Sequence, residues 1–518
     1  MNTSQAAAFP WLTVLILVPL VAAIVLASVK ALHRHAKAYG LAVSILVLIG
    51  SVAAFASEFD AGSAGTVQLA ETYSWMPSLG VSVAWGVNGM GAVMIGLAVL
   101  LVPLVILTAE HDRFLRPEEV EAGRRTAGYI AWVLALEAVM IGIFAAQDVF
   151  LFYVLFEAML IPVYFLIGSY GGPQRKAAAL KFLLYSLAGG LIMLVGVVAV
   201  YVSGPGGPEG FLIANLAGNV SGSQTAQMLM FLSFFIAFAV KAPMFPVHTW
   251  LADATEQAPS GTSALLVGVL DKVGTYGMIA LCIPLFPGAA ADAAMVIMIL
   301  ALVSILWGGF VAIYSRDLMR LIAFTSVSHF GFMVMGIFSG SEVAMTGAIL
   351  YMVAHGVGTA ALFLIVGYLA KRGGSQSVMD FGGWQRVTPV LAGGFLVAGL
   401  ATLSLPGLSG FVPEFMVLVG TFEVSKVIGG LAVLGVILAA LYILLPYQRV
   451  FTGPRPDVPV KDLGGAEKTV VGVLTAGMLV LGFMPGPVID LVQPVAEQAV
   501  VAFEDTADTS ALVEGNLK

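Results

Sequence analysis

Charged side chains are scarce in this sequence. Asp, Glu, Lys and Arg make up 10% of its 518 residues, while 59% are hydrophobic and the mean hydropathy is +0.99. Soluble globular proteins are about a quarter charged, so a soluble multidomain enzyme is excluded. Disorder requires low hydrophobicity, and the strands of an outer-membrane barrel alternate polar and apolar residues, so both are excluded too. An all-α polytopic membrane protein remains.

Cysteine is nearly absent as well. The single Cys282 excludes an internal disulfide, a cysteine-bound zinc site and a cysteine-ligated iron–sulfur cluster. No phosphate-binding glycine loop of the P-loop or dinucleotide type occurs. The net charge of −7 provides no basic patch, so nucleic acid is not an expected partner. We expect no cofactor and no metal site in this chain.

Apolar runs of about 20 residues, the length of a membrane-spanning helix, occur fourteen times. They lie near 11–29, 38–57, 86–109, 128–146, 149–170, 177–203, 226–252, 262–285, 294–313, 317–339, 343–370, 388–422, 428–449 and 469–493. The first run lacks the charged start and the cleavage site of a signal peptide, so we expect it to be retained as the first helix.

The basic residues alternate between the connections. Odd-numbered connections contain 18 of the 23 Lys and Arg residues, whereas even-numbered connections and the termini contain only Lys426 and Lys518. The 18 are Lys30, Arg34, Lys37, Arg113, Arg116, Arg124, Arg125, Arg175, Lys176, Arg316, Arg320, Lys371, Arg372, Arg386, Arg449, Arg455, Lys461 and Lys468. The positive-inside rule then predicts cytoplasmic odd connections and both termini on the outer side.

Proline interrupts two of the runs. The seventh is broken at Pro243 and Pro246, beside Lys241, and the twelfth between Pro406 and Pro413, beside Glu414. Paired broken helices at corresponding positions indicate an inverted repeat around a central ion site. The predicted parts are a three-helix segment (1–127), a first five-helix repeat of spans 4–8 (128–285), a second of spans 9–13 (294–449), and span 14 with a C-terminal tail (450–518).

Nine ionisable residues fall at membrane depth, where a charge costs about 2.5–3.5 kcal/mol on insertion scales. They are Glu137, Glu157, Lys181, Lys241, Asp271, Lys272, His329, His355 and Glu414. Glu157, Lys272 and the two histidines lie near the middle of their spans, which suggests a row of groups parallel to the membrane.

Glu157 and Lys241 are candidates for a proton switch. A lone buried carboxyl stays protonated, whereas one beside an ammonium ionises, and a buried lysine readily changes its protonation state. The alternative is a static ion pair that only fixes helix packing.

Lys272, His329 and His355 are candidates for a proton relay, because histidine titrates close to neutral pH. His248 follows the first break, and shaping that break is a simpler role for it than proton relay. Asp271 is either a partner for a cation on another helix or a polar lining residue. Glu137 and Lys181 stay open between structural and functional roles.

Several motifs are similar to those of one known family. They are Phe150–Glu157 followed by Pro162–Ile167, Val240–Pro243 with Pro246–Leu251, Arg320–His329, Ala354–Gly356, and Leu405–Gly407 through Glu414–Phe415. With them the chain resembles the antiporter-like, proton-pumping membrane subunits of respiratory complex I, most closely the M type, also called chain 4. Glutamate at position 414, where the sister L and N types have lysine, favours the M type.

The resemblance implies roles for these residues. Glu157 and Lys241 would form the ion pair, Lys272 the central connector, His329 and His355 the bridge, and Glu414 the terminal carboxylate. Asp271 departs from the family, which usually has an apolar residue there.

The resemblance also implies a setting. The chain would translocate protons as a subunit of an NADH:quinone oxidoreductase in a bacterial-type inner membrane, beside L-type and N-type subunits. FMN, iron–sulfur clusters and quinone would belong to partner subunits and the peripheral redox arm. The alternatives are a D-type subunit of a multi-subunit Na⁺/H⁺ antiporter and a passive membrane scaffold.

Overall fold

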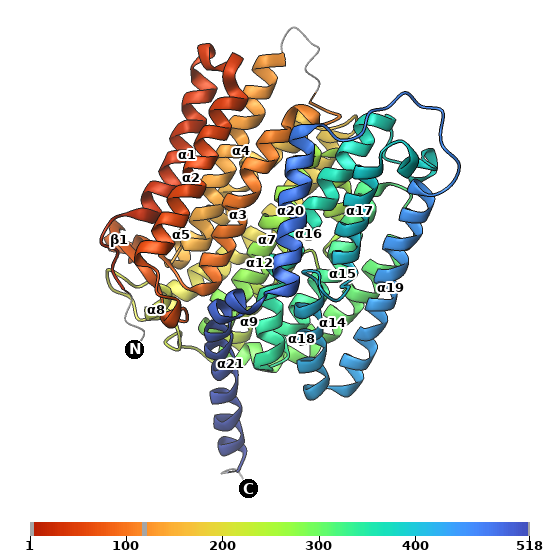
Figure 1. The fold of residues 1–518 in the computed structure, drawn as a ribbon. Coiled ribbons are helices and arrows are strands. Elements are labelled where there is room, and N and C mark those ends of the chain that lie inside the picture. The colour runs from red at the N-terminus through yellow and green to blue at the C-terminus, as the bar shows by residue number, and fades with distance from the viewer. Residues whose placement is uncertain (1–4, 116–121, 516–518) are drawn as a thin grey trace.

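The computed structural model describes residues 5–115 and 122–515. The loop cation Arg116 and the tail cation Lys518 lie outside these residues. Long helices run roughly side by side across the bundle, and the colours pass from α1 and α2 at one edge to α19 at the other (Figure 1).

The first part of the chain contains three long helices and a hairpin. Its elements are α1 (Trp11–Ser28), α2 (Ala36–Glu58), β1 (Gln68–Met76), β2 (Val81–Val87) and α3 (Gly89–Thr108). The antiparallel β1–β2 hairpin was not among the predicted elements. It lies at the same end of the bundle as the last helix, α21 (Figure 1).

The two halves that follow have similar helix orders. The first contains α4 (Ala122–Ala145), α5 (Val149–Ala158), α6 (Leu160–Tyr170), α7 (Arg175–Ser203), α8 (Ile213–Leu216), α9 (Gln224–Lys241), α10 (Thr249–Gln257), α11 (Ser260–Leu265), α12 (Lys272–Gly277) and α13 (Ile283–Leu285). The second contains α14 (Pro287–Tyr314), α15 (Leu318–Phe338), α16 (Glu342–Gly373), α17 (Pro389–Thr402), α18 (Phe411–Val424) and α19 (Lys426–Phe451).

A short antiparallel bridge occurs at matching places in the two halves. It joins Asp148 to Leu212 in the first half and Asp317 to Ser377 in the second. Asp148 caps the start of α5 by accepting hydrogen bonds from two backbone N–H groups, and Asp317 caps α15 in the same way. These matching features support the repeat that the broken runs indicated.

The predicted breaks occur where proline interrupts the runs. The first separates α9 from α10, and the second separates α17 from α18. Within the described residues, thirteen helical segments are long and apolar enough to span a membrane. The twelfth predicted span is not among them, because its break leaves two short helices, α17 and α18.

The last predicted span is too long. Helix α20 (Gly465–Phe483) ends ten residues before the predicted limit of 493, and α21 (Gly486–Gly515) follows as a separate helix. Pro485 and Pro487 explain the difference, because proline removes helical hydrogen bonds.

The central apolar stretches of α15 and α16 are fully buried inside the bundle, and that of the segment from α11 to α13 is almost as buried. Two carboxylates outside the membrane core anchor this interior. Asp112 Oδ2 accepts hydrogen bonds from the backbone N–H and the hydroxyl of Ser260, both at 2.6 Å, and so fixes the start of α11. Glu467 of α20 pairs with Arg372 at the end of α16 through two hydrogen bonds of 2.9 and 2.6 Å.

Candidate functional site

The six principal candidates come from six different helices that meet in the bundle interior. Five are buried, with exposed fractions of 1% for Lys241, 0% for Lys272, 1% for His329, 5% for His355 and 2% for Glu414. Glu157 is partly buried.

Lys272 has the most fully defined surroundings. Its ammonium donates a hydrogen bond to the carbonyl of Val267 at 2.5 Å and lies 2.7 Å from His355 Nδ1. The face of the Phe330 ring is 5.2 Å away, a cation–π distance. The Lys272 ammonium therefore contacts a carbonyl oxygen, an imidazole nitrogen and an aromatic ring. Within the described residues, no carboxylate is among its hydrogen-bond partners.

Helix geometry explains how Lys272 reaches Val267. Residues Leu266–Leu270 form a π-helical turn just before α12, and Met278–Cys282 form a second one just after it. π-Helical turns widen the backbone and are frequent at functional sites.

Small residues let this segment approach α16. A Cβ atom on Gly268 would lie 3.3 Å from the carbonyl of Gly356, and one on Gly356 would lie 2.7 Å from the carbonyl of Gly268. The close contact places Lys272 against His355, the neighbour of Gly356.

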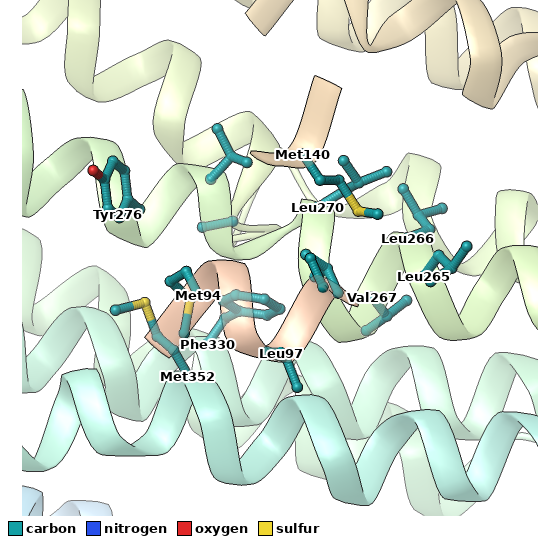
Figure 2. Packing of buried hydrophobic residues seen from close by; sticks show 14 of the residues in the cluster. Met94, Leu97, Met140, Leu265, Leu266, Val267, Leu270, Tyr276, Phe330 and Met352 are labelled. Carbon is teal, nitrogen blue, oxygen red and sulfur yellow. The ribbon is translucent and has the colours of Figure 1, made fainter. Parts of the chain in front are cut away.

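Apolar side chains surround the same segment. Figure 2 shows Met94 and Leu97 of α3, Phe330 of α15 and Met352 of α16 near Val267. A polar contact in such surroundings is shielded from bulk water, so it is electrostatically stronger than at the surface.

A second hydrogen-bonded group begins at His329. Its Nδ1 lies 2.5 Å from the hydroxyl of Tyr351, and its Nε2 lies 3.1 Å from the hydroxyl of Tyr442. The rings of His329 and His355 are 5.3 Å apart between centroids. The two histidines are therefore neighbours, as predicted from their depth.

Glu414 ends this group. It lies in the first turn of α18, just after the second break, and its Oε2 accepts hydrogen bonds from Tyr351 at 2.5 Å and from Ser404 at 2.8 Å. Tyr351 thus connects His329 to Glu414.

A small cavity lies beside the two histidines and Tyr351, and Thr402 and Gly410 contribute to its wall. Its volume is about 10 Å³, roughly the space that one water molecule needs. His355 Nε2 has no hydrogen-bond partner among the described residues. A single water here would accept from His355 Nε2 and donate to the Tyr351 hydroxyl, because both ring nitrogens of His329 already have partners.

The first half is arranged differently. Within the described residues, no ion pair joins Glu157 and Lys241, although the resemblance implies one. The Lys241 ammonium lies over the rings of Phe156 and Phe182, at 5.5 and 5.2 Å. One oxygen of Glu157 has no hydrogen-bond partner in the described part of the chain, and its carboxylate packs on Gly190 of α7.

Three less certain candidates lie apart from the row. Lys181 pairs with Asp253 at 2.6 Å in a partly exposed network with Arg320. His248 packs against aromatic rings at the start of α10. Glu137 of α4 is fully buried, and neither of its oxygens has a partner in the described residues. Their roles stay predictions.

Sequence reasoning missed three connecting residues: Tyr351, Tyr442 and Ser404. Tyr351 precedes His355 by four residues, a spacing that places both on one helix face, and this signal was available. No comparable signal marks Tyr442 or Ser404. Within the described residues, no group of three or more His, Cys, Asp or Glu side chains is arranged to hold a metal ion.

A family described as NADH:quinone oxidoreductase/Mrp antiporter, TM, matches residues 146–441. The chain is 42% identical over 521 residues to NADH-quinone oxidoreductase subunit M of Mycobacterium tuberculosis, covering 95% of this chain and 94% of that protein. It is 38% identical over 505 residues to the subunit M of Rhodobacter capsulatus, covering 93% and 95%.

Solved structures agree. A chain of respiratory complex I from Thermus thermophilus with bound NADH matches with a TM-score of 0.86 and 32% identity, covering 95% of this chain and 99% of that one. A chain of the Mrp complex from Dietzia matches with a TM-score of 0.84 at 22% identity, covering 96% and 99%, a likeness of fold alone. The chain belongs to the NADH:quinone oxidoreductase/Mrp antiporter transmembrane family.

Proposed function

We propose that this chain is a proton-translocating membrane subunit of an NADH:quinone oxidoreductase. Protons move along a row formed by Glu157, Lys241, Lys272, His355, His329 and Glu414. The observation that carries the proposal is the series of short contacts in the second half. Lys272 contacts His355, and Tyr351 joins His329 to Glu414.

Counting donors and acceptors gives a resting arrangement that supports the proposal. A tyrosine hydroxyl has one hydrogen, and that of Tyr351 goes to Glu414. His329 Nδ1 must then donate to Tyr351, which leaves its Nε2 to accept from Tyr442. Likewise, His355 Nδ1 accepts from the Lys272 ammonium, so its own hydrogen is on Nε2.

The same contacts work in the reverse direction. Once His329 has received a proton on Nε2, its Nδ1 proton passes to the Tyr351 oxygen and the Tyr351 proton passes to Glu414. Protonated Glu414 then donates to Tyr351, Tyr351 donates to His329 Nδ1, and His329 Nε2 donates to the Tyr442 hydroxyl. Every group in the chain keeps a partner in both arrangements. A proton can therefore pass along it by reorienting hydrogen bonds, without large side-chain motion.

The wider setting follows from the family. The chain is a multi-pass subunit of a multi-subunit complex I membrane arm. We propose L-type and N-type subunits as its neighbours, and a peripheral redox arm that contains FMN and iron–sulfur clusters and delivers electrons to quinone. We place the complex in a bacterial inner membrane with both chain termini on the outer side, which the distribution of basic residues supports.

The test uses the complete complex in sealed vesicles. Lys241→Ala and Glu157→Gln each remove one member of the row, so NADH-driven proton uptake should fall about 10²-fold or more, as expected for losing a positioned proton carrier. The amount of assembled complex on a native gel is the control. Normal uptake by both assembled variants would support the passive scaffold instead.

The dependence of activity on sodium distinguishes the Na⁺/H⁺ antiporter alternative from the proposed function. Sodium prefers several oxygen ligands, whereas the centre of this row is lysine and histidine nitrogen. We expect proton uptake at fixed pH to be independent of sodium. Sodium-dependent activity that is lost in Lys272→Ala would favour the antiporter reading.

A further inference from the structure

Asp271 is a carboxylate with no assigned partner. It is completely buried, and neither oxygen has a hydrogen-bond partner among the described residues. Burying an isolated carboxylate is costly, and nearly all buried polar groups in proteins are satisfied. A buried carboxylate without a partner in the middle of a membrane span therefore indicates a functional role.

The α12 segment presents two different faces. Lys272 and Thr275 face α16, where they contact His355 and Met352. Residues three apart on a helix share a face. Asp271 therefore lies in line with Gly274 and Gly277.

That second face packs against α9. A Cβ atom on Gly274 would lie 2.5 Å from both the Phe238 carbonyl and the Ala242 amide nitrogen, and Gly277 lies against the Phe238 ring. Backbone therefore touches backbone here. Asp271 is one helical turn from this contact, and Lys241 is the residue next to Ala242.

Charge agrees with the packing. The Lys241 ammonium is coupled electrostatically to Asp271 and to Glu157, and the coupling to Asp271 is the stronger. The Lys272 ammonium, in contrast, is already engaged by Val267 and His355 on the other face. Asp271 therefore lies between the two lysines and is coupled to both, more strongly to its chain neighbour Lys272 than to Lys241.

We propose that Asp271 is a second carboxylate partner of Lys241, alternating with Glu157, and that it passes the proton from Lys241 to Lys272. An N–H bond of the Lys241 ammonium breaks and an O–H bond forms on Asp271, leaving a neutral amine and a neutral acid. When the Lys272 ammonium has passed its own proton to His355 Nδ1, the acid protonates the neutral Lys272 amine, which restores the Asp271 carboxylate. The inference rests on the proposed function and fills the gap between its two halves.

The first experiment measures pumping. Asp271→Asn keeps the shape of the side chain but cannot accept the proton, so uptake should fall about tenfold, less than for loss of Lys241 because Glu157 remains. Asp271→Glu retains the acid and should recover at least half of the activity. Wild-type uptake by the assembled Asp271→Asn complex would overturn the relay.

The second experiment measures the pair itself through assembly. Removing one member of a buried ion pair is far more destabilising than removing both. Lys241→Met should therefore lower the temperature at which the detergent-solubilised complex dissociates, and adding Asp271→Asn should restore it. The matched control is Lys241→Met with Glu137→Gln, which removes a buried carboxylate that is not coupled to Lys241 and should show no recovery.

The readouts separate the two proposals. No recovery with Asp271→Asn, or equal recovery with Glu137→Gln, would overturn the pairing of Asp271 with Lys241. Normal pumping by Lys241→Met would overturn the proposed function, while the dissociation temperatures still report whether Lys241 and Asp271 are partners.

Discussion

The two broken helices of this protein hold their charged residues in different ways. At the second break, Glu414 accepts hydrogen bonds from Tyr351 and Ser404 and is fixed in one position. At the first break, Lys241 has aromatic rings beside it and two carboxylates near it, but no ion pair among the described residues. The backbone of the first break is nevertheless secured, because the Trp250 indole donates to the carbonyl of Val240 at 2.9 Å.

The difference separates two tasks. The Glu414 carboxylate is held in position by two side-chain donors, so it gains or loses its proton in place. An ammonium between two carboxylates can pair with either one, so a small shift in geometry can change its partner. We therefore expect the first half to switch and the second half to conduct.

The largest effect should come from a substitution that removes no ionisable group. Gly190→Ala would place a methyl group where the Glu157 carboxylate now packs. Because Glu157 is displaced from the Lys241 side of α7, proton uptake should fall about 10²-fold in vesicles, close to the effect of Glu157→Gln.

The neighbouring glycine is the matched control. A Cβ atom on Gly189 would lie 3.3 Å from the Cα of Ala237, which must move by a few tenths of an ångström, and its nearest atoms belong to α9 and not to Glu157. Gly189→Ala changes helix propensity in the same way, so it should assemble and pump nearly normally. Equal losses in both variants would mean that Gly190 serves only helix packing.

A smaller loss is expected from Tyr351→Phe in the second half. The substitution removes the one hydroxyl that links His329 to Glu414 but leaves every charge in place. Proton uptake and quinone-linked turnover should both fall about tenfold, because the two processes are coupled and slowing proton transfer slows electron transfer.

Tyr442→Phe provides the comparison for that variant. Its hydroxyl lies 3.1 Å from His329 Nε2, so Tyr442 lies beside the series His329–Tyr351–Glu414 and does not link its members. Similar losses from both tyrosines would show that His329 orientation, and not the link to Glu414, limits transfer.

The smallest effect should come from Ser404. Its backbone has a φ of 62°, a left-handed conformation that favours glycine, so its hydroxyl is the reason to have serine there. Ser404→Gly and Ser404→Ala each remove one hydrogen bond to Glu414, of about 1 kcal/mol, and should lower proton uptake by about fivefold at most. Glycine should assemble at least as well as alanine. Wild-type proton uptake in both variants would mean that Ser404 only shapes the break between α17 and α18.

Much of this fold was predictable because membrane spans leave strong local signals. Apolar runs and proline breaks fixed the helix order and the two interruptions. The exception at the C-terminus, where α20 ends at Phe483, came from reading through a proline pair as continuous helix. The β1–β2 hairpin lies outside the apolar runs, so hydropathy contained no signal for it.

The site was predictable only in its charged members. Buried charge is rare enough in a span to be noticed, whereas tyrosine and serine in apolar helices usually belong to ordinary packing. The π-helical turn at Leu266–Leu270 was not predictable, because it depends on contacts with other helices and not on local sequence. That turn determines where Lys272 and Asp271 point.

The burial of the central stretches of α15 and α16 has a consequence for biosynthesis. Both are apolar enough to enter a bilayer, yet in the finished protein they are enclosed by other helices of the same chain. Helices made later, including α19, must then pack around them after α15 and α16 have met lipid. Their hydrophobicity therefore serves membrane insertion more than final contact with the bilayer, and polar groups such as His329, Tyr351 and His355 are tolerated once the outer helices arrive.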